Sequence, residues 1–277
     1  ALHPKVTADF FKNPKAVKII AESLFKQSPD VIVLQEVGDK ESLQKLADMG
    51  KNITEYEAIF IQGHDQRKDN LNDDPSYDRH IGFLIKKSLG LKYKLLSNTS
   101  LSYKGESIQR DYVFDRGLPT LVFYKDGVSQ PLFTVIGAHN HSLGKNAKFK
   151  DLKTIEEQAM IYIIQQIAHA YGQRHPIMLM GDMNTEVNDP RQLGSFKNYM
   201  RDSFTDQKVD AYDPRRITHG FTQLNYAKRP RQVDAVFINP VLAGRVIKTE
   251  TLQMPDFVSD HRPVMVEINF KGLMPVK

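Results

Sequence analysis

The sequence predicts an α+β fold in which two β-sheets pack face to face and helices cover their outer sides. Apolar runs of strand length are numerous along the 277 residues, whereas helical periodicity is confined to a few segments. The strands also do not alternate strictly with helices, as they would in a doubly wound parallel sheet. Because the chain has no internal repeat, low-complexity segment or Pro/Gly/Ser-rich linker, we expect a single domain over residues 1–277.

The N-terminal part of the chain predicts a helix, a strand and a second helix. Asn13 is suited to cap the first helix and Pro14 to begin it, and apolar residues then recur at helical spacing up to Phe25. Residues 31–34 form a continuous apolar run, which is typical of a strand covered on both faces. The second helix is expected at about residues 41–49.

The middle of the chain predicts a long loop followed by strands. Residues 62–80 are almost entirely polar, and long loops of this kind in compact domains are often binding loops. Residues 81–87 are a strand candidate, and residues 118–139 are expected to form two strands joined by a turn at 125–127.

The most regular helical pattern lies at residues 154–171. Thr154 and Glu157 have the spacing of a capping box, and Gly172 is suited to end the helix. Three later apolar runs are expected to form strands: 176–180, 233–239 and 263–270.

Composition limits the chemistry that the protein can carry out. The absence of cysteine excludes thiolate zinc sites, cysteine nucleophiles and disulfides. No apolar stretch approaches the ~18 residues of a membrane span, and the first ten residues lack the apolar segment of a signal peptide. The formal net charge of +5 mildly favours polyanionic or phosphate-bearing partners. A cysteine-free chain is compatible with an oxidising compartment, so a secreted or periplasmic location is favoured, with the cytoplasm as the alternative.

Polar side chains stand at the ends of five predicted strands. They are Glu36 after Gln35, His139 with Ser142 three residues later, Asp182 with Asn184, Asp234, and Asp260 with His261. Taken singly, each has an ordinary explanation, such as a surface salt bridge, a buried histidine with a partner, or a turn. Turns explain Gly, Asn and Asp, but they do not explain a glutamate and two histidines at such places. Their joint occurrence therefore indicates one functional site. Carboxylates without cysteine favour Mg²⁺ or Mn²⁺ over zinc, and histidines and amides beside such an ion suit a phosphate.

The ordered segments "LQEV", "AHNHS", "GDMN", "VDAVFIN" and "SDHRPV" resemble the endonuclease/exonuclease/phosphatase superfamily. This superfamily includes deoxyribonuclease-like nucleases, abasic-site endonucleases, deadenylases, inositol-phosphate phosphatases and sphingomyelinases. The resemblance runs from about residue 13 to 270, and "DRHIGFLIKK" and "FDRGLPTLVFY" are similar to the secreted bacterial nuclease-like branch. It implies a four-layer α/β/β/α sandwich of two mixed, mostly antiparallel sheets with outer helices, which agrees with the pattern of predicted elements.

The resemblance also implies which residues bind the metal and activate water. Glu36 matches the family's metal-binding glutamate, and Asp260 matches the acid beside the metal. The implied ion is Mg²⁺ or Mn²⁺, with Ca²⁺ possible. Asp182 matches the aspartate that orients or deprotonates the attacking water.

Other residues match the phosphate side of the family site. Asn184 matches the amide that holds a phosphate oxygen, and His261 matches the histidine that contacts the phosphate. Asp234 resembles the acid that orients this histidine, and His139 resembles a second phosphate-side histidine. Three further residues are placed like phosphate-binding residues: Arg79, Arg116 and Ser142.

The resemblance implies a metal-dependent phosphodiesterase, and we expect a monomeric nuclease of low sequence specificity that acts on DNA or RNA. Two basic stretches, 145–153 and 225–232, are expected to be loops that either track a phosphate backbone or form an ordinary solvated surface. A phosphomonoesterase, a phospholipid phosphodiesterase and a non-catalytic relative that binds nucleic acid are the competing interpretations. No Gly-x-Ser-x-Gly, Gly-x-x-x-x-Gly-Lys or Gly-x-Gly-x-x-Gly pattern indicates another chemistry.

One departure from the family concerns the start of the chain. The family normally opens with a strand inside a sheet that ends in a metal-site asparagine, and this sequence begins just after that point. We therefore expect a groove in the core, with residues upstream of Ala1 forming a strand of about 5–6 residues. The alternative is that residues 1–8 bend back to fill the groove.

Overall fold

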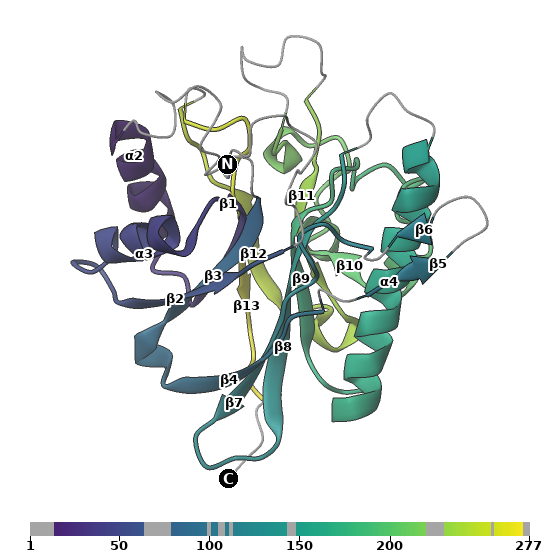
Figure 1. The fold of residues 1–277 in the computed structure, drawn as a ribbon, viewed down its shortest axis with the longest axis horizontal. Helices are drawn as coiled ribbons and strands as arrows, with labels where there is room; N and C mark the ends of the chain where they lie inside the picture. The colour runs from purple at the N-terminus through teal and green to yellow at the C-terminus, as the bar shows by residue number, and fades with distance from the viewer. Residues whose placement is uncertain are drawn as a thin grey trace.

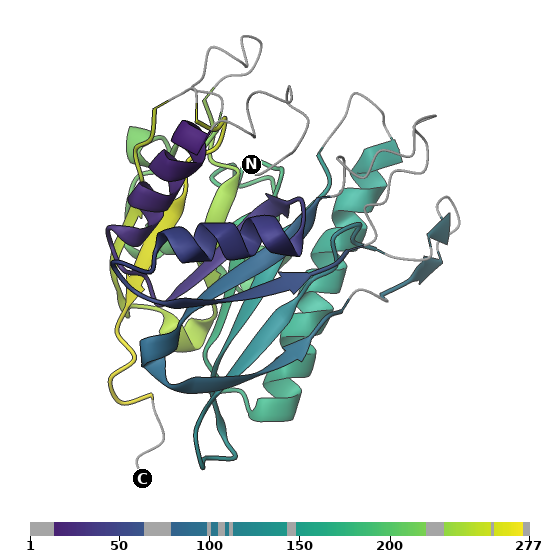
Figure 2. The same ribbon diagram turned by 60° about the vertical axis from the view of Figure 1, so that its left-hand side comes forward.

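In the computed structural model, two β-sheets face each other and helices lie on both outer sides (Figures 1 and 2). The structure describes residues 14–63, 79–98, 101–104, 109–110, 113–142, 148–219, 230–255 and 258–273. This architecture confirms the α/β/β/α sandwich expected from the sequence.

The central sheet has six strands in the order β10-β11-β9-β8-β7-β4. Its pairings are antiparallel except for β8 and β9, which run parallel. The strands are β4 (Leu91–Leu96), β7 (Thr120–Lys125), β8 (Pro131–His139), β9 (Ile177–Asp182), β10 (Arg201–Asp202) and β11 (Asp234–Ile238). The predicted strands of residues 118–139, 176–180 and 233–239 are therefore all in this sheet.

The second layer is divided into two parts. One part has the order β1-β3-β2 and the other consists of β12 and β13. The strands are β1 (Val31–Val37), β2 (Tyr56–Ile61), β3 (His80–Lys86), β12 (Val246–Thr251) and β13 (Val264–Ile268). A separate two-stranded ribbon, β5 (Tyr103–Lys104) with β6 (Gln109–Arg110), completes the strands of the described residues.

A cavity of about 200 Å³ separates the two parts of this layer. Within the described residues, β1 pairs only with β3, and β13 pairs only with β12, so the facing edges of β1 and β13 are joined by no ladder. Ile20 and Leu24 of the first helix line the cavity on one side, and Met180 and Val236 of the central sheet line it on the other. The groove in the core and what occupies it stay predictions, because the structure describes this gap only between residues from 14 onward.

Helices cover the outer faces of both sheets. Helices α2 (Pro14–Phe25) and α3 (Lys40–Met49) lie over the divided sheet, as Figure 2 shows, and α4 (Lys148–Tyr171) lies along the central sheet. Asp39 caps α3, because its side chain accepts a hydrogen bond from the backbone N–H of Ser42 at 2.6 Å. The remaining helices are short: α5 (Ser203–Asp206) and the 3-10 turns η2 (Lys87–Leu89), η3 (Phe196–Asn198), η4 (Pro214–Arg216) and η6 (Pro240–Leu242).

Two expectations about the longest helix are wrong. Helix α4 begins at Lys148 rather than at residue 154, so Thr154 and Glu157 lie inside it. Glu157 does not close a capping box, because its Oε1 accepts a hydrogen bond from the backbone N–H of Phe196 at 2.8 Å. The basic stretch 145–153 is likewise helical from Lys148 onward, and most of the stretch 225–232 lies outside the described residues.

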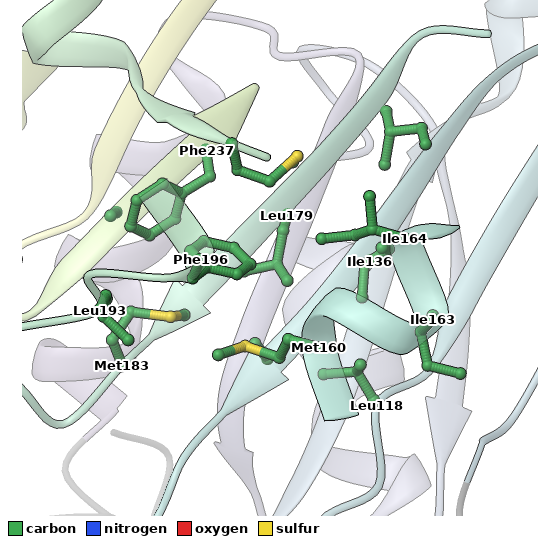
Figure 3. Packing of buried hydrophobic residues seen from close by; sticks show 14 of the residues in the cluster. Leu118, Ile136, Met160, Ile163, Ile164, Leu179, Met183, Leu193, Phe196 and Phe237 are labelled. Atoms are coloured by element: carbon green, nitrogen blue, oxygen red, sulfur yellow. The ribbon is translucent and has the colours of Figure 1, made fainter. Parts of the chain in front are cut away.

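The main hydrophobic core lies between α4 and the central sheet. Figure 3 shows Met160 and Ile164 of the helix packed with Ile136 and Leu179 of the strands. The rings of Phe196 and Phe237 meet edge to face with their centroids 4.9 Å apart. Burial of these side chains fixes α4 against β8 and β9, whose ends carry the polar residues described next.

Candidate active site

The ends of three neighbouring strands bring the sequence-predicted acids and one histidine together. In the central sheet, His139 at the end of β8 lies opposite Asp182 at the end of β9, and Asp182 lies opposite Asp234 at the start of β11. A backbone ladder therefore sets the spacing of these three residues.

The close approach of β8 and β9 explains why the residue before Asp182 is a glycine, Gly181. A Cβ atom at this position would lie 1.8 Å from the carbonyl oxygen of Ala138, and the residue has φ +152°. Only glycine allows β8 and β9 to approach this closely at their ends. The "GDMN" segment thus combines a close strand contact with a polar site.

Asp182, Asp234 and His261 each place a ligand-type atom within 4.8 Å of the others. His261 Nδ1 lies 2.8 Å from Asp234 Oδ2. Burial alone would lower the pKa of His261, but the charge of Asp234 and its hydrogen bond, with Asp182 and Asp260 nearby, raise this pKa to about 10. His261 is therefore an imidazolium paired with Asp234, and the orienting role of Asp234 stays a prediction.

The carboxyl group of Asp182 has a raised pKa. Burial, followed by the negative charge of Asp234, raises the pKa of its carboxyl group to about 7. A base whose pKa lies near the working pH combines availability with proton affinity. Its Oδ1 accepts a hydrogen bond from the backbone N–H of Asn184 at 2.7 Å, which fixes the carboxylate in the turn after β9.

Asn184 is held by a hydrogen bond from its own side chain. It has φ +48°, and its Nδ2 donates to the backbone carbonyl of Asn140 at 2.8 Å. Asparagine tolerates this left-handed conformation better than most residues, and strained positions of this kind cluster at functional sites. Its amide is thereby fixed beside Asp182, where an amide that binds phosphate is predicted.

His139 is buried at 3 % exposure between two carboxylates. Its Nε2 lies 3.7 Å from Asp182 Oδ2 and 4.0 Å from Glu36 Oε1. Burial, followed by the positive charges of Arg116 and Arg79, lowers the pKa of His139 well below its usual value. His139 is therefore neutral, in contrast to His261.

The predicted metal and phosphate ligands at the edge of this cluster have different surroundings. Glu36 has φ +56°, where an irregularity in β1 breaks the pairing register with β3, and its Oε1 accepts a hydrogen bond from Arg79 at 2.8 Å. Arg116 is buried at 5 % exposure, and its charge acts on His139. Ser142, by contrast, is exposed.

Asp260 lies beside a histidine that the sequence analysis did not identify. Its Oδ2 lies 3.8 Å from His219 Nε2, and the His219 and His261 rings are 4.6 Å apart. Burial works to raise the pKa of Asp260, but the charges of His261 and His219 outweigh it, so the pKa is lowered. Burial, followed by the charge of His261, lowers the pKa of His219 to about 4.

The donor atoms present fit a hard divalent cation. Among the described residues, two groups of carboxylates and histidines are compact enough to share an ion: Asp182–Asp234–His261 and His219–Asp260–His261. Asp260 is the ionised carboxylate of the second group. Glu36 belongs to neither group, and its Oε1 pairs with Arg79. Oxygen donors of this kind suit Mg²⁺, Mn²⁺ or Ca²⁺.

Four residues beside the site were missed by the sequence analysis: His219, Asp115, His141 and Glu156. His219, Asp115 and Glu156 lie in loops or in helix α4, whereas His141 lies two residues beyond the end of β8. The second histidine of "AHNHS" was the only available signal for His141, because two histidines two apart at a strand end point to the same side.

No protein-family model matches this chain, and no curated protein matches its sequence. Solved structures do match its fold. Truncated Caenorhabditis elegans TDP2 superposes with a TM-score of 0.63 at 14 % identity, covering 94 % of this chain and 91 % of that one. An endonuclease/exonuclease/phosphatase family protein from Bacteroides thetaiotaomicron matches with a TM-score of 0.58 at 15 % identity, covering 91 % and 88 %. The mannosyl-6-phosphatase Bt3783 of the same organism matches with a TM-score of 0.60 at 16 % identity, covering 92 % and 91 %.

These matches extend over nearly the whole of each chain. The chain therefore shares the fold of these structures, which is the fold that the sequence resemblance implied. At these identities the likeness concerns the fold, so the activity has to be argued from the site itself.

Proposed function

We propose that this protein is a divalent-metal-dependent phosphodiesterase, and in particular a nuclease of low sequence specificity that hydrolyses DNA or RNA. One observation carries the proposal: Asp182, Asp234 and His261 lie within 4.8 Å of one another at the ends of separate segments, with neutral His139 against Asp182. A base, an oriented cation and a neutral imidazole are the groups that an in-line attack of water on a phosphodiester requires.

Each residue has a distinct role in this proposal. Asp182, with its pKa near 7, orients the attacking water and accepts its proton. The His261 imidazolium, held by Asp234, and the fixed amide of Asn184 stabilise the negative charge on the phosphate oxygens. His139 lies on the phosphate side as a neutral donor.

The metal would be held by Asp260 together with Glu36. When bound, a divalent cation neutralises charge on the phosphate and polarises its oxygens. Arg79, which donates to Glu36 Oε1 at 2.8 Å, would stand beside the bound ion, where its guanidinium could also reach a phosphate oxygen. Arg116 and Ser142 complete the proposed phosphate-binding set.

We propose a nucleic acid as the substrate because the protein carries a net positive charge, which favours binding to a phosphate backbone. The formal net charge is +5, and Arg79 and Arg116 lie at or near the cluster. We propose that the protein acts as a monomer. Within the described residues, no helix has both the length and the apolar character that a membrane crossing needs.

A phosphomonoesterase is the second candidate. The solved structure of mannosyl-6-phosphatase Bt3783 has this fold at a TM-score of 0.60, so the fold accommodates that class as well. Hydrolysis of a phospholipid diester and nucleic-acid binding without catalysis are less favoured, because no feature of the described site selects either of them.

One assay panel tests the proposal. Plasmid DNA, single-stranded DNA, RNA, a phosphomonoester and a phospholipid are each incubated with Mg²⁺, Mn²⁺, Ca²⁺ or EDTA. We expect hydrolysis of nucleic acid that needs a divalent ion, stops in EDTA and slows steeply as salt rises, because phosphate contacts release counterions. Full activity in EDTA would exclude the mechanism, and turnover of the phosphomonoester alone would select the second candidate.

A further inference from the structure

A second cluster of charged residues lies beside the proposed catalytic residues. It consists of Asp115, His141, Lys153 and Glu156. Glu156 is completely buried and His141 is 9 % exposed. Buried charges are tolerated when they are paired, so each charged side chain in this cluster needs an oppositely charged neighbour.

His141 is the centre of this cluster. Its Nδ1 lies 2.6 Å from Glu156 Oε1, and its backbone N–H donates to the same oxygen at 2.8 Å. Its Nε2 faces Asp115 Oδ2 across a short contact. When both acids are ionised they only accept hydrogen bonds, and because a neutral imidazole has a single N–H, contacts on both sides then call for the doubly protonated ring. Burial opposes this charge, but the two carboxylates outweigh burial and hold the pKa of His141 above its usual value.

The cluster connects two segments that carry proposed site residues. Asp115 directly precedes Arg116 in the chain. His141 directly follows Asn140, whose carbonyl accepts the side-chain amide of Asn184. The imidazolium therefore joins the Arg116 loop to the end of β8.

Helix α4 joins the third segment to the same cluster. Lys153 Nζ lies 3.5 Å from Glu156 Oε2 and donates to the carbonyl of Met183 at 2.8 Å. Met183 lies between Asp182 and Asn184 in the chain. A displacement of Glu156 would therefore move Lys153 and, through it, the turn that carries the proposed base. Among the described residues, the charged groups in printed contact around His141 are Asp115 from the loop and Glu156, with Lys153 behind it, from the helix.

We propose that His141 is a positioning residue, whose imidazolium joins Asp115 to Glu156 and thereby fixes Arg116 and Asn184 for binding a phosphate. The inference rests on the proposed function for its effect on turnover, although the effect on phosphate binding is independent of hydrolysis. Small displacements of groups that orient a substrate cost up to about 100-fold in rate.

The test compares His141→Gln with His141→Lys. Glutamine removes the cation between the two carboxylates, whereas lysine keeps one. We expect His141→Gln to lower kcat/KM for the phosphodiester by about 10- to 100-fold and to weaken binding of inorganic phosphate in calorimetry. We expect His141→Lys to retain most of the wild-type kcat/KM and most of the wild-type phosphate affinity. We also expect this variant to keep its activity at alkaline pH, where the activity of the wild type declines because His141 loses its proton.

His175 supplies a matched control. It is also a buried histidine, bonded through Nε2 to Thr134 Oγ1 at 2.7 Å, but it lies before the start of β9, at the opposite end of the strand from Asp182. His175→Gln should lower the melting temperature and leave kcat/KM and phosphate affinity unchanged. If His141→Gln behaves in the same way, His141 has only a structural role and the proposal is wrong.

Two further readouts keep the inference separate from the proposed function. Nitrogen-15 NMR of wild-type histidines at pH 7.5 should show both ring nitrogens of His141 protonated, and a neutral ring would contradict the proposal without any variant. If the wild type hydrolyses nothing but binds phosphate, and His141→Gln weakens that binding, the proposed function fails and this inference stands. If His141→Gln does not fold, Asp115→Asn removes one side of the same contact and should weaken phosphate binding in the same direction.

Discussion

The central sheet is continuous from β10 to β4, whereas the layer facing it is divided between β1 and β13. In the continuous sheet, backbone ladders place His139, Asp182 and Asp234 side by side. In the divided layer, Glu36 lies in β1 on one side of the gap, and His261 lies just before β13 on the other side. The two halves of the proposed site are thus built by different means.

Backbone pairing therefore positions the residues of the central sheet, whereas side-chain contacts position the residues of the divided layer. His261 is tied to the central sheet through Asp234 at 2.8 Å, and Glu36 is tied to Arg79 at 2.8 Å. Neither is positioned by a ladder between β1 and β13. We expect the proposed base to be insensitive to the gap, and the proposed metal-binding pair, Glu36 and Asp260, to respond to anything that fills it.

Breaking the ladder should have the largest effect on the fold. Gly181→Ala would place a Cβ 1.8 Å from the carbonyl of Ala138, so β8 and β9 must separate at their ends. We expect a loss of about 4 kcal/mol in the free energy of unfolding, measured by urea denaturation. Gly194→Ala, which meets nothing within 4 Å, is the control and should unfold like the wild type. Equal stability of the two variants would mean that the close approach at Gly181 is not a constraint.

The second prediction concerns the loss of folding stability caused by ionising the buried carboxyl group of Asp182. Because the pKa of Asp182 is raised to about 7 in the folded state, the folded protein holds a proton that the unfolded chain releases near pH 4. The contribution of Asp182 to wild-type stability therefore falls as pH rises from about 4 to 7. In EDTA, Asp182→Asn should melt several degrees above the wild type at pH 8, and this difference should shrink toward pH 4. A difference that does not depend on pH would mean that the carboxyl group is not held protonated in this way.

The third prediction tests the gap itself. A strand of about six residues that ends in asparagine and is fused ahead of Ala1 should pair with both β1 and β13, whose facing edges share no ladder within the described residues. We expect slower amide hydrogen exchange in β1 and β13, a melting temperature higher by about 5 °C, and tighter divalent-metal binding. The same extension with proline at alternate positions cannot complete the ladders and should have no effect. Unchanged exchange in both strands would show that the gap does not accept a strand.

The smallest effect is expected at the other end of the central sheet. Burial lowers the pKa of His175 to about 4, so the unfolded chain takes up a proton near pH 6.5 before the folded protein does. Its contribution to stability is therefore complete above about pH 6.5 and is lost as pH falls toward 4. His175→Gln should reduce the melting temperature modestly at pH 7 and by a smaller amount at pH 4.5. An equal reduction at both values would show that the ring titrates normally.

The sequence predicts those parts of the site that depend on short segments. Apolar runs locate β8, β9 and β11, and the polar residues at their ends indicate the cluster of Asp182 and Asp234 before any contact is known. The ladder between strands then follows, because neighbouring strand ends meet at one edge of a sheet. Gly181 is also understandable from the sequence as a residue that allows close approach.

Residues brought in by long-range packing could not be predicted in this way. Glu156 lies in α4 four residues from the buried Leu152 and Met160, but a charged residue type gives no sign that it is completely buried against His141. His219 has no strand-end signal and reaches Asp260 through an irregular segment. The mistaken capping box has a similar cause, since Glu157 bonds to Phe196, 39 residues away.

The most direct test of the account is the turnover of Asp182→Asn on the best substrate of the assay panel, measured beside His261→Ala and the surface variant Asp126→Asn. Asp182 and His261 form the cluster with Asp234, whereas Asp126 lies in the turn between β7 and β8 and pairs only with exposed Lys92 among the described residues. We predict that Asp182→Asn and His261→Ala each lower kcat by about 10²- to 10⁴-fold while remaining folded, and that Asp126→Asn retains full activity. Near-normal turnover by Asp182→Asn would contradict the central claim that the strand-end cluster is the catalytic site.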